Sequence, residues 1–293
     1  MRVFITGATG FIGFPVCQEL IAAGHKVLGL ARSDEGASKL SSIGVEVHRG
    51  SLHDLDSLKS GAAAADAVIH TAFIHDFSKF EENCEIDRLA IEALGSVLAG
   101  SARPLIVTSG TGGVAAPGTL ATEENVPPPN PRLPRLSEQT AMALLDKGVS
   151  SAVMRLPQVH DPLKQGLVTR VIAIAREKGI SAYVGDGLNR WPAAHVSDVA
   201  KLYRLALEQH EAGAKYHAVA EEGVRLRDIA ESLGRGLNLP VKSLSPEEAQ
   251  AHFGWYAMFA GHDVPTSSAL TRKKLGWNPT GPGLIADLEQ KKY

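Results

Sequence analysis

The sequence has little cysteine and no long apolar run. Its two cysteines, Cys17 and Cys84, lack the spacing of metal ligands, which argues against a disulfide framework or a zinc site and predicts no bound metal. No apolar run reaches the roughly 18 residues that a membrane-spanning helix needs. Because the chain opens directly on strand-forming residues, we expect no signal peptide. These absences together predict a soluble cytoplasmic protein without a membrane partner.

The chain also lacks an excess of charge of either sign. Its 30 lysines and arginines nearly balance 32 aspartates and glutamates, for a formal net charge of −2 at pH 7. This balance gives no electrostatic reason to expect nucleic acid as a partner. No Gly-x-Ser-x-Gly elbow, typical of many hydrolases, occurs. The 293 residues suffice for one large α/β domain, or for one domain with a smaller lobe, acting on a small molecule.

What the sequence does contain is a glycine-rich turn at its start. Strand-forming residues 2–5 lead into Thr6-Gly7-Ala8-Thr9-Gly10-Phe11-Ile12-Gly13, here called the glycine corner, and a helical pattern follows. Gly7 permits a sharp turn, Gly10 permits close approach to a pyrophosphate, and Gly13 permits close helix–strand packing. The N–H groups at the helix start then face the anion. The order predicts a dinucleotide-binding corner; the alternative is a glycine-rich turn of another α/β protein.

The second strand, over 26–30, ends at Ala31-Arg32-Ser33. In dinucleotide folds the residue after this strand meets the adenosine ribose, and an acid there binds the 2′-hydroxyl of NAD. Arg32 and Ser33 suit a 2′-phosphate instead, because a guanidinium matches phosphate oxygens. We therefore favour NADP(H) over NAD(H). The alternative is that Arg32 is a solvated loop charge.

Strand and helix patterns alternate along the first half of the chain. Strands are expected at 45–48, 67–70, 104–107 and 151–155, with helices at 34–43, 80–98 and 137–147. This alternation predicts a doubly wound parallel sheet, the Rossmann fold. The proline-rich stretch 114–134 breaks the pattern and predicts a surface loop, either a wall of the substrate crevice or an inert connection.

The second half is less regular and predicts a smaller, discontinuous substrate-binding lobe. We expect residues 1–160 to form the dinucleotide-binding domain, with 186–220 returning to it, and 161–185 and 221–293 to form the lobe. Helices are expected at 168–178 and 226–237, and Asp198 is expected to cap a further helix.

Five stretches resemble landmarks of the extended short-chain dehydrogenase/reductase family, which includes NAD-dependent epimerases, dehydratases and 3β-hydroxysteroid dehydrogenases. They are the glycine corner, Val68-Ile69-His70-Thr71-Ala72, Val107-Thr108-Ser109-Gly110, Arg155-Leu156-Pro157-Gln158-Val159 and His195-Val196-Ser197-Asp198-Val199-Ala200. The resemblance implies that 71–73 line the cofactor and that 157–159 meet the nicotinamide side. It also places Asp87 where the family often has an asparagine.

The cofactor-binding residues expected from the fold and the resemblance together are Gly7, Thr9, Gly10, Phe11, Ile12, Gly13, Arg32, Ser33, Ser51, Leu52, Thr71, Ala72, Phe73, Thr108, Pro157 and Val159.

The sequence departs from the family at its catalytic pair. The family uses a Tyr-x-x-x-Lys pair with a preceding Ser or Thr, but this chain has no Tyr-x-x-x-Lys. By register, Pro134 takes the tyrosine place and Glu138 the lysine place. The serine landmark falls at Gly110 or Thr111, depending on the count. We interpret the chain as an atypical branch to which the usual proton relay does not transfer.

Histidine is the natural substitute as proton donor, because its ordinary pKa lies near neutrality. His75 and His160 each follow a strand end of the predicted sheet, so both are catalytic candidates; the alternative for each is a loop histidine bonded to backbone. Ser109 and Thr111 are candidates to hydrogen-bond a substrate carbonyl, or caps of their loop. His195 is expected to be structural.

The leading hypothesis is an NADP(H)-dependent oxidoreductase acting on a small or medium carbonyl, alcohol or imine substrate with a non-standard proton donor. A sugar-nucleotide-type epimerase or dehydratase is the second reading. A non-catalytic NADP(H)-sensing protein is the third. We expect a monomer or a homodimer.

Overall fold

The computed structural model describes residues 1–127 and 134–293, and it divides into two compact units. The first comprises Met1–Gly110, Pro129–Arg155 and Val199–Tyr216, and the second comprises Thr111–Pro128, Leu156–Asp198 and His217–Tyr293. The part of the predicted proline-rich loop that spans 128–133 lies outside the described residues.

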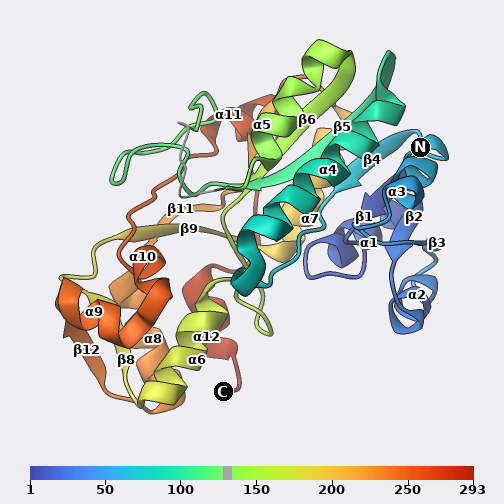
Figure 1. Ribbon diagram of the computed structural model, residues 1–293. Helices are drawn as coiled ribbons and strands as arrows, with labels where there is room; N and C mark the ends of the chain where they lie inside the picture. The colour runs from blue at the N-terminus through green and yellow to red at the C-terminus, as the bar shows by residue number, and fades with distance from the viewer. Residues whose placement is uncertain (128–133) are drawn as a thin grey trace. The chain divides into compact units, whose positions relative to one another are not determined.

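The first unit is built on a seven-stranded sheet with the strand order β10-β6-β5-β4-β1-β2-β3 (Figure 1). The strands are β1 (Arg2–Thr6), β2 (Lys26–Ala31), β3 (Glu46–Arg49), β4 (Ala67–His70), β5 (Ser101–Gly110), β6 (Val149–Leu156) and β10 (Lys215–His217). β1 pairs in parallel with β2 and β4, and β2–β3 and β4–β5 are parallel as well. This confirms the predicted doubly wound parallel sheet.

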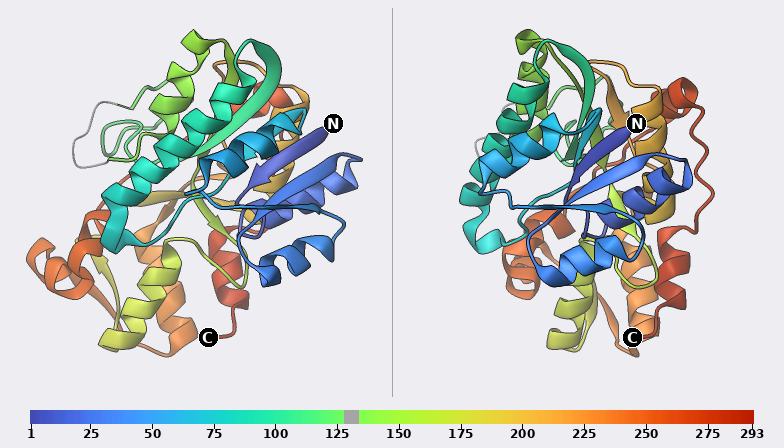
Figure 2. Two further views of the ribbon diagram at one scale, coloured as in Figure 1. Left: turned by 45° about the vertical axis from the view of Figure 1, so that its right-hand side comes forward. Right: turned by 90° about the vertical axis from the view of Figure 1, so that its right-hand side faces the viewer.

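Helices cover both faces of this sheet, as Figure 2 shows most clearly in its right-hand view. α3 (Leu55–Ala63), α4 (Phe80–Leu98) and α5 (Ser137–Ala143) lie along one face, and α1 (Gly13–Ala22) and α7 (Val196–Glu208) on the other. α2 (Asp34–Ser41) connects β2 to β3, and short 3-10 turns occupy Phe77–Lys79 and Leu145–Lys147. All four residues of β4 are buried, as expected for a strand covered on both faces.

The local patterns predicted several of these elements correctly. α4 has the predicted bounds, and the Asp54 carboxylate caps α3 by accepting from the Ser57 N–H at 3.0 Å. The helix predicted over 137–147 ends instead at Ala143 and continues as a 3-10 turn. The fifth strand is longer than predicted.

The second unit contains two small sheets. β9 (Arg190–His195) pairs with β11 (Glu221–Arg225) and β7 (Gln158–His160), while β8 (Ser181–Val184) pairs with β12 (Val241–Leu244). Its helices are α6 (Val168–Lys178), α8 (Leu226–Leu237), α9 (Pro246–Phe253), α10 (Ala257–Ala260), α11 (Ala269–Leu275) and α12 (Leu284–Gln290), with a 3-10 turn at Gly254–Tyr256. Trp191 and Tyr256 pack together in its apolar core.

Asp198 lies inside the first turn of α7 rather than at its cap, so the prediction of a capping role was wrong. Its buried carboxylate accepts instead from the N–H groups of Thr280, at 3.2 Å, and Gly281, at 2.6 Å. A partner 82 or 83 residues away in sequence leaves no local signal at Asp198.

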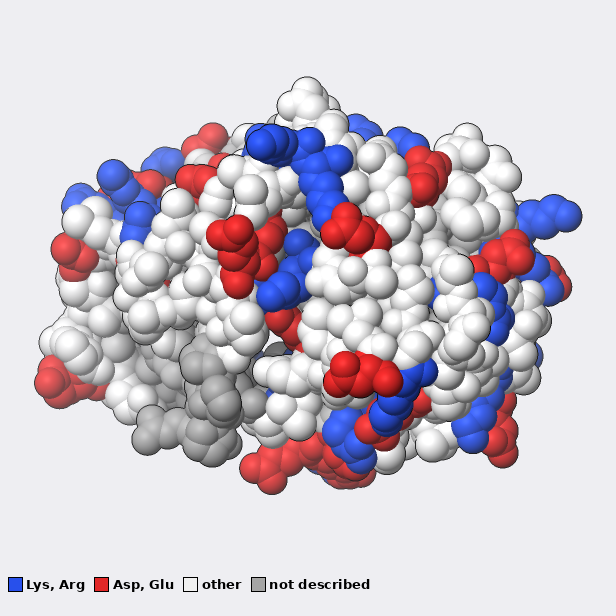
Figure 3. Space-filling model, turned by 90° about the horizontal axis from the view of Figure 1, so that it is seen from above, with Lys and Arg blue, Asp and Glu red and all other residues white. Residues whose placement is uncertain are grey.

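Among the described residues, no helix is long and apolar enough to cross a membrane. Within the same residues, no group of three or more His, Cys, Asp or Glu side chains is arranged to hold a metal ion. The face drawn in Figure 3 intersperses basic and acidic side chains.

Candidate functional site

The glycine corner has the geometry of a pyrophosphate cradle. Gly7 has φ +70°, in the left-handed region, and its carbonyl accepts from the Gly10 N–H at 2.9 Å. A Cβ at Gly13 would run into the Gly7 carbonyl and come within 2.9 Å of the Thr71 hydroxyl oxygen. α1 starts at Gly13 without a side-chain cap, and its Phe14 N–H donates to the Gly10 carbonyl at 3.0 Å. The backbone therefore fits a dinucleotide and has no room for side chains there.

The end of β2 is held by a basic side chain from β3. Arg49 donates from Nη1 to the Ser33 carbonyl and from Nη2 to the Asp34 carboxylate, both at 2.6 Å. The Ser33 hydroxyl caps α2 by accepting from the Gly36 N–H at 3.1 Å. Asp34, one of two acids in the first turn of α2 with Glu35, thus pairs with Arg49, while Arg32 is exposed beside it. The arrangement offers cations where the adenosine ribose is expected.

Three further predicted cofactor contacts are Thr9, in the corner, and Ser51 and Leu52, after β3. The Lys39 ammonium donates to the Thr9 carbonyl at 3.1 Å and lies 4.3 Å from the centre of the Phe14 ring. After β3, Ser51 is half-buried and Leu52 is buried in the core of the sheet.

A buried chain of hydrogen bonds connects the end of β1 to the start of α5. The His70 Nδ1 atom lies 2.8 Å from the Thr6 hydroxyl oxygen, and the His70 Nε2 atom donates to Asp87 at 3.1 Å. The second Asp87 oxygen accepts from the Ser137 hydroxyl at 2.6 Å. Burial by itself raises the pKa of Asp87, but the interactions with His70, Arg135 and Ser137 outweigh it and lower that pKa. Asp87, predicted at an asparagine position, is thus the centre of a fixed polar network.

Arg135 continues this chain at the carboxyl edge of the sheet. Its Nε donates to the Ser137 hydroxyl at 2.8 Å and its Nη2 to the Thr108 carbonyl at 3.2 Å. Its guanidinium carbon lies 4.2 Å from the centre of the Phe73 ring, within the range of a cation–π contact. Sequence reasoning missed Arg135, although it directly follows Pro134.

The lysine place of the family holds a buried ion pair. Glu138 accepts from Arg155, at 2.8 Å from Nε and 2.5 Å from Nη2. The two side chains are 5% and 0% exposed. α5 starts at Ser137, so Pro134, at the tyrosine place, lies outside the helix. A buried, paired carboxylate cannot assist a tyrosine as a lysine does.

Tyr203 lies near the same strand end but is not available as a substitute. Its hydroxyl is 2.7 Å from the Thr108 hydroxyl, which itself donates to the His70 carbonyl at 2.7 Å. Burial raises the pKa of Tyr203 far above its ordinary value. We assign it a structural role.

The structure places the catalytic candidates in different units. His75 and Ser109 lie in the first, Thr111 and His160 in the second. His75 is exposed as a residue, but its ring packs edge-on against Phe73, with the centroids 5.3 Å apart. Burial of the ring lowers the pKa of His75, and the positive charge of Arg135 acts in the same direction. His75, Arg135 and Phe73 thus form one group.

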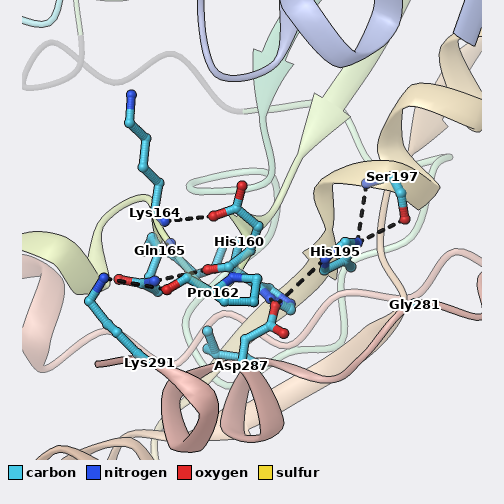
Figure 4. A network of polar contacts seen from close by, with 12 residues as sticks. His160, Pro162, Lys164, Gln165, His195, Ser197, Gly281, Asp287 and Lys291 are labelled. Carbon is cyan, nitrogen blue, oxygen red and sulfur yellow. Dashed lines mark hydrogen bonds and ion pairs between the residues drawn. The ribbon is translucent and has the colours of Figure 1, made fainter. Parts of the chain in front are cut away.

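In the second unit, His160 is fully buried and held by α12 (Figure 4). Its Nδ1 lies 2.6 Å from Asp287, whose same oxygen is 3.8 Å from the His195 Nε2. Burial lowers the pKa of His160, although the neighbouring Asp287 opposes this shift. Asp287 was not predicted, because 127 residues separate it from His160.

The other predicted site residues of this unit, Thr111, Pro157 and Val159, lie in or near β7. The Thr111 N–H donates to the Leu156 carbonyl at 3.0 Å, and Pro157 connects β6 to β7. Val159, in β7, is buried. The predicted nicotinamide-side residues are therefore fixed by strand pairing with β9.

The fold is a doubly wound α/β fold with a glycine-rich turn after β1, and comparison with known proteins identifies the family. The sequence matches the NAD dependent epimerase/dehydratase family over residues 3–220, and the chain belongs to this family. The resemblance inferred from the sequence is thereby confirmed.

Relatives in several organisms match most of the chain. An uncharacterized protein of Schizosaccharomyces pombe is 49% identical over 296 residues, covering 100% of both chains. The 4-hydroxy-2-methyl-3-oxo-4-farnesyl-3,4-dihydroquinoline-1-oxide ketoreductase of Stigmatella aurantiaca is 26% identical and covers 94% of this chain and 92% of its own.

Among solved structures, the Thermus thermophilus UDP-glucose 4-epimerase, in complex with NAD, is similar with a TM-score of 0.74 at 21% identity. The match covers 100% of this chain and 98% of that one. At this identity the similarity supports the fold alone.

Proposed function

We propose that the chain is an NADP(H)-dependent oxidoreductase that interconverts a small or medium-sized ketone and its alcohol. The observation that carries the proposal is the glycine corner, where a Cβ at Gly13 would collide with backbone. Gly7 and Gly13 are required by the backbone of the turn itself, and Gly10 adds the third glycine by which dinucleotide folds admit a pyrophosphate. The ketoreductase among the relatives supports a carbonyl substrate.

The choice of NADP(H) rests on the turn after β2. Arg32 is exposed there, and Asp34 is paired with Arg49 at 2.6 Å. An acid that binds the NAD ribose needs a free carboxylate, whereas the 2′-phosphate of NADP is matched by guanidinium groups.

When bound, the dinucleotide supplies the hydride for the carbonyl carbon. The chain must then supply a proton to the carbonyl oxygen and hold that oxygen in place. We assign the role of proton donor to His75, and we assign the hydrogen bond to the carbonyl oxygen to the Ser109 hydroxyl. His160 and Thr111 are the second candidates for these two roles. A pKa below the ordinary value makes protonated His75 a stronger acid, and it also makes this protonated form the minor one near neutral pH.

Cofactor binding tests the proposal. NADPH at about 100 times its Kd should stabilise the native chain by about 2.7 kcal/mol, and NADH at equal concentration should stabilise it less. Arg32→Ala should weaken NADPH binding and leave NADH binding unchanged. Equal binding of the two dinucleotides by the native chain would contradict the choice of NADP(H).

Turnover tests the catalytic assignment and separates an enzyme from a sensing protein. Oxidation of NADPH is followed by absorbance against a panel of ketones, with His75→Ala, His160→Ala and, as a control, His262→Ala, which changes an exposed histidine. Loss of turnover in His75→Ala alone supports His75. No loss in either candidate variant refutes both donors.

A further inference from the structure

Arg135 carries a guanidinium that is fixed in place before any ligand binds. One face stacks on Phe73 at 4.2 Å, and the Nε and Nη2 atoms donate to the Ser137 hydroxyl and the Thr108 carbonyl. Nη1 makes no hydrogen bond to the part of the chain that the structure describes. The side chain is only partly buried. A guanidinium that is fixed through Nε and Nη2 loses little conformational entropy when Nη1 binds an oxygen ligand.

No carboxylate of the described residues pairs directly with Arg135 within 4.0 Å. Asp87 is connected to it only through the Ser137 hydroxyl, and each Asp87 oxygen already accepts a hydrogen bond, one from Ser137 and one from His70. The positive charge of Arg135 is therefore only indirectly balanced. An unbalanced, partly buried guanidinium attracts an external anion more strongly than a solvated one does.

The Arg135 guanidinium lies near the candidate proton donor. Phe73 contacts both Arg135 and the His75 ring, and Thr108, which accepts from Arg135, directly precedes Ser109. An anion bound by Arg135 would therefore lie within the group formed by His75, Phe73 and Arg135. It is a suitable place for a substrate carboxylate, because the guanidinium fork matches the two carboxylate oxygens.

We propose that Arg135 binds a carboxylate of the substrate, so that the enzyme acts on anionic carbonyl compounds such as 3-oxo acids in preference to neutral analogues. This inference rests on the proposed function. It assigns the family's vacated tyrosine region to recognition of the substrate, while the proton comes from elsewhere.

Binding of a small dicarboxylate tests the inference without knowledge of the substrate. Malonate is the probe and malonamide its neutral analogue, titrated into the full chain with and without saturating NADPH and followed by calorimetry. We expect malonate to bind more tightly than malonamide. Arg135→Gln should weaken malonate binding about tenfold to a hundredfold, since a hydrogen bond to a charged group is worth that much.

Two further variants control the result. Arg135→Lys keeps the charge but not the fork, so we expect a partial loss. Arg88→Gln, which removes a surface arginine paired with Glu85 and Glu92, should bind malonate as the native chain does. If Arg135→Gln is unstable, the Arg135→Lys variant alone decides, and undiminished malonate binding by it overturns the inference.

Catalysis gives a second readout. The native chain and Arg135→Gln are compared by kcat/KM for acetoacetate divided by kcat/KM for ethyl acetoacetate. We expect this ratio to fall in Arg135→Gln, because KM for acetoacetate rises. The inference is overturned if this ratio is unchanged, if the native chain binds no malonate, or if Arg135→Gln weakens NADPH and malonate equally. Failure to bind NADPH refutes the proposed function instead, and it is measured separately in the same titrations.

Discussion

Removing the Glu138 carboxylate should strongly destabilise the first unit. Glu138 and Arg155 are 5% and 0% exposed, and two hydrogen bonds of 2.8 and 2.5 Å join them. Glu138→Ala leaves a buried guanidinium without its carboxylate. Breaking a buried pair in this way costs about 3–5 kcal/mol of unfolding free energy. Glu138→Gln keeps the shape but not the charge, so we expect a smaller loss.

An exposed pair in the same unit provides the matched control. Glu85 pairs with Arg88 on α4, and the two side chains are 54% and 29% exposed. Glu85→Ala should cost less than about 1 kcal/mol, because solvent screens the pair. Glu138→Lys, which restores the family's residue, would place a cation against Arg155 and should be at least as harmful as Glu138→Ala.

The assay is urea unfolding of the full chain followed by far-UV circular dichroism. Tryptophan fluorescence is unsuitable, because all three tryptophans lie in the second unit. A loss in Glu138→Ala that is no larger than in Glu85→Ala would refute the reasoning. It would mean that the ion pair is solvated or that the site relaxes without it.

Three other perturbations have defined outcomes. Gly13→Ala should cost about 1–3 kcal/mol through overpacking and abolish NADPH binding, measured by urea unfolding and calorimetry, whereas Gly112→Ala, with open space around its Cβ, should change neither. Folding lowers the pKa of His160, so its contribution to stability is fully present above the unfolded pKa of about 6.5 and is lost as the pH falls below that value. His160→Gln should reduce this loss of stability, which is measured by urea unfolding between pH 8 and pH 5. Arg135→Gln removes a positive charge near His75 and should raise the pKa of His75 in an NMR titration; no change would contradict the proximity of the two side chains.

The fold could be predicted because its determinants are local. Apolar strands alternating with amphipathic helices specify a parallel sheet wherever they occur. α4 was predicted to the residue for the same reason, since its apolar spacing and its ends are contained in 80–98.

The polar network could not be predicted, because its partners are far apart in sequence. Ser137 and Asp87 are 50 residues apart, and His160 and Asp287 are 127 apart. Nothing near Asp198 indicated that its carboxylate would bind two N–H groups after residue 279. Side-chain pairing of this kind depends on the tertiary fold, which local patterns do not encode.

The absence of a Tyr-x-x-x-Lys pair is evident from the sequence, but the contacts of the residues that stand in its place are not. The sequence shows Pro134 and Glu138 at the positions where the family has tyrosine and lysine. Only the structure shows that Glu138 pairs with Arg155 and that Arg135 stacks on Phe73. The direction of a side chain in an irregular segment is set by its packing partners.

Calorimetric titration of the purified chain with NADPH and NADH tests the central claim most directly. The account predicts saturable binding of NADPH at one site per chain, weaker binding of NADH, and loss of NADPH binding in Gly13→Ala. If neither dinucleotide binds the native chain, the glycine corner is not a cofactor site and the proposed redox function is contradicted.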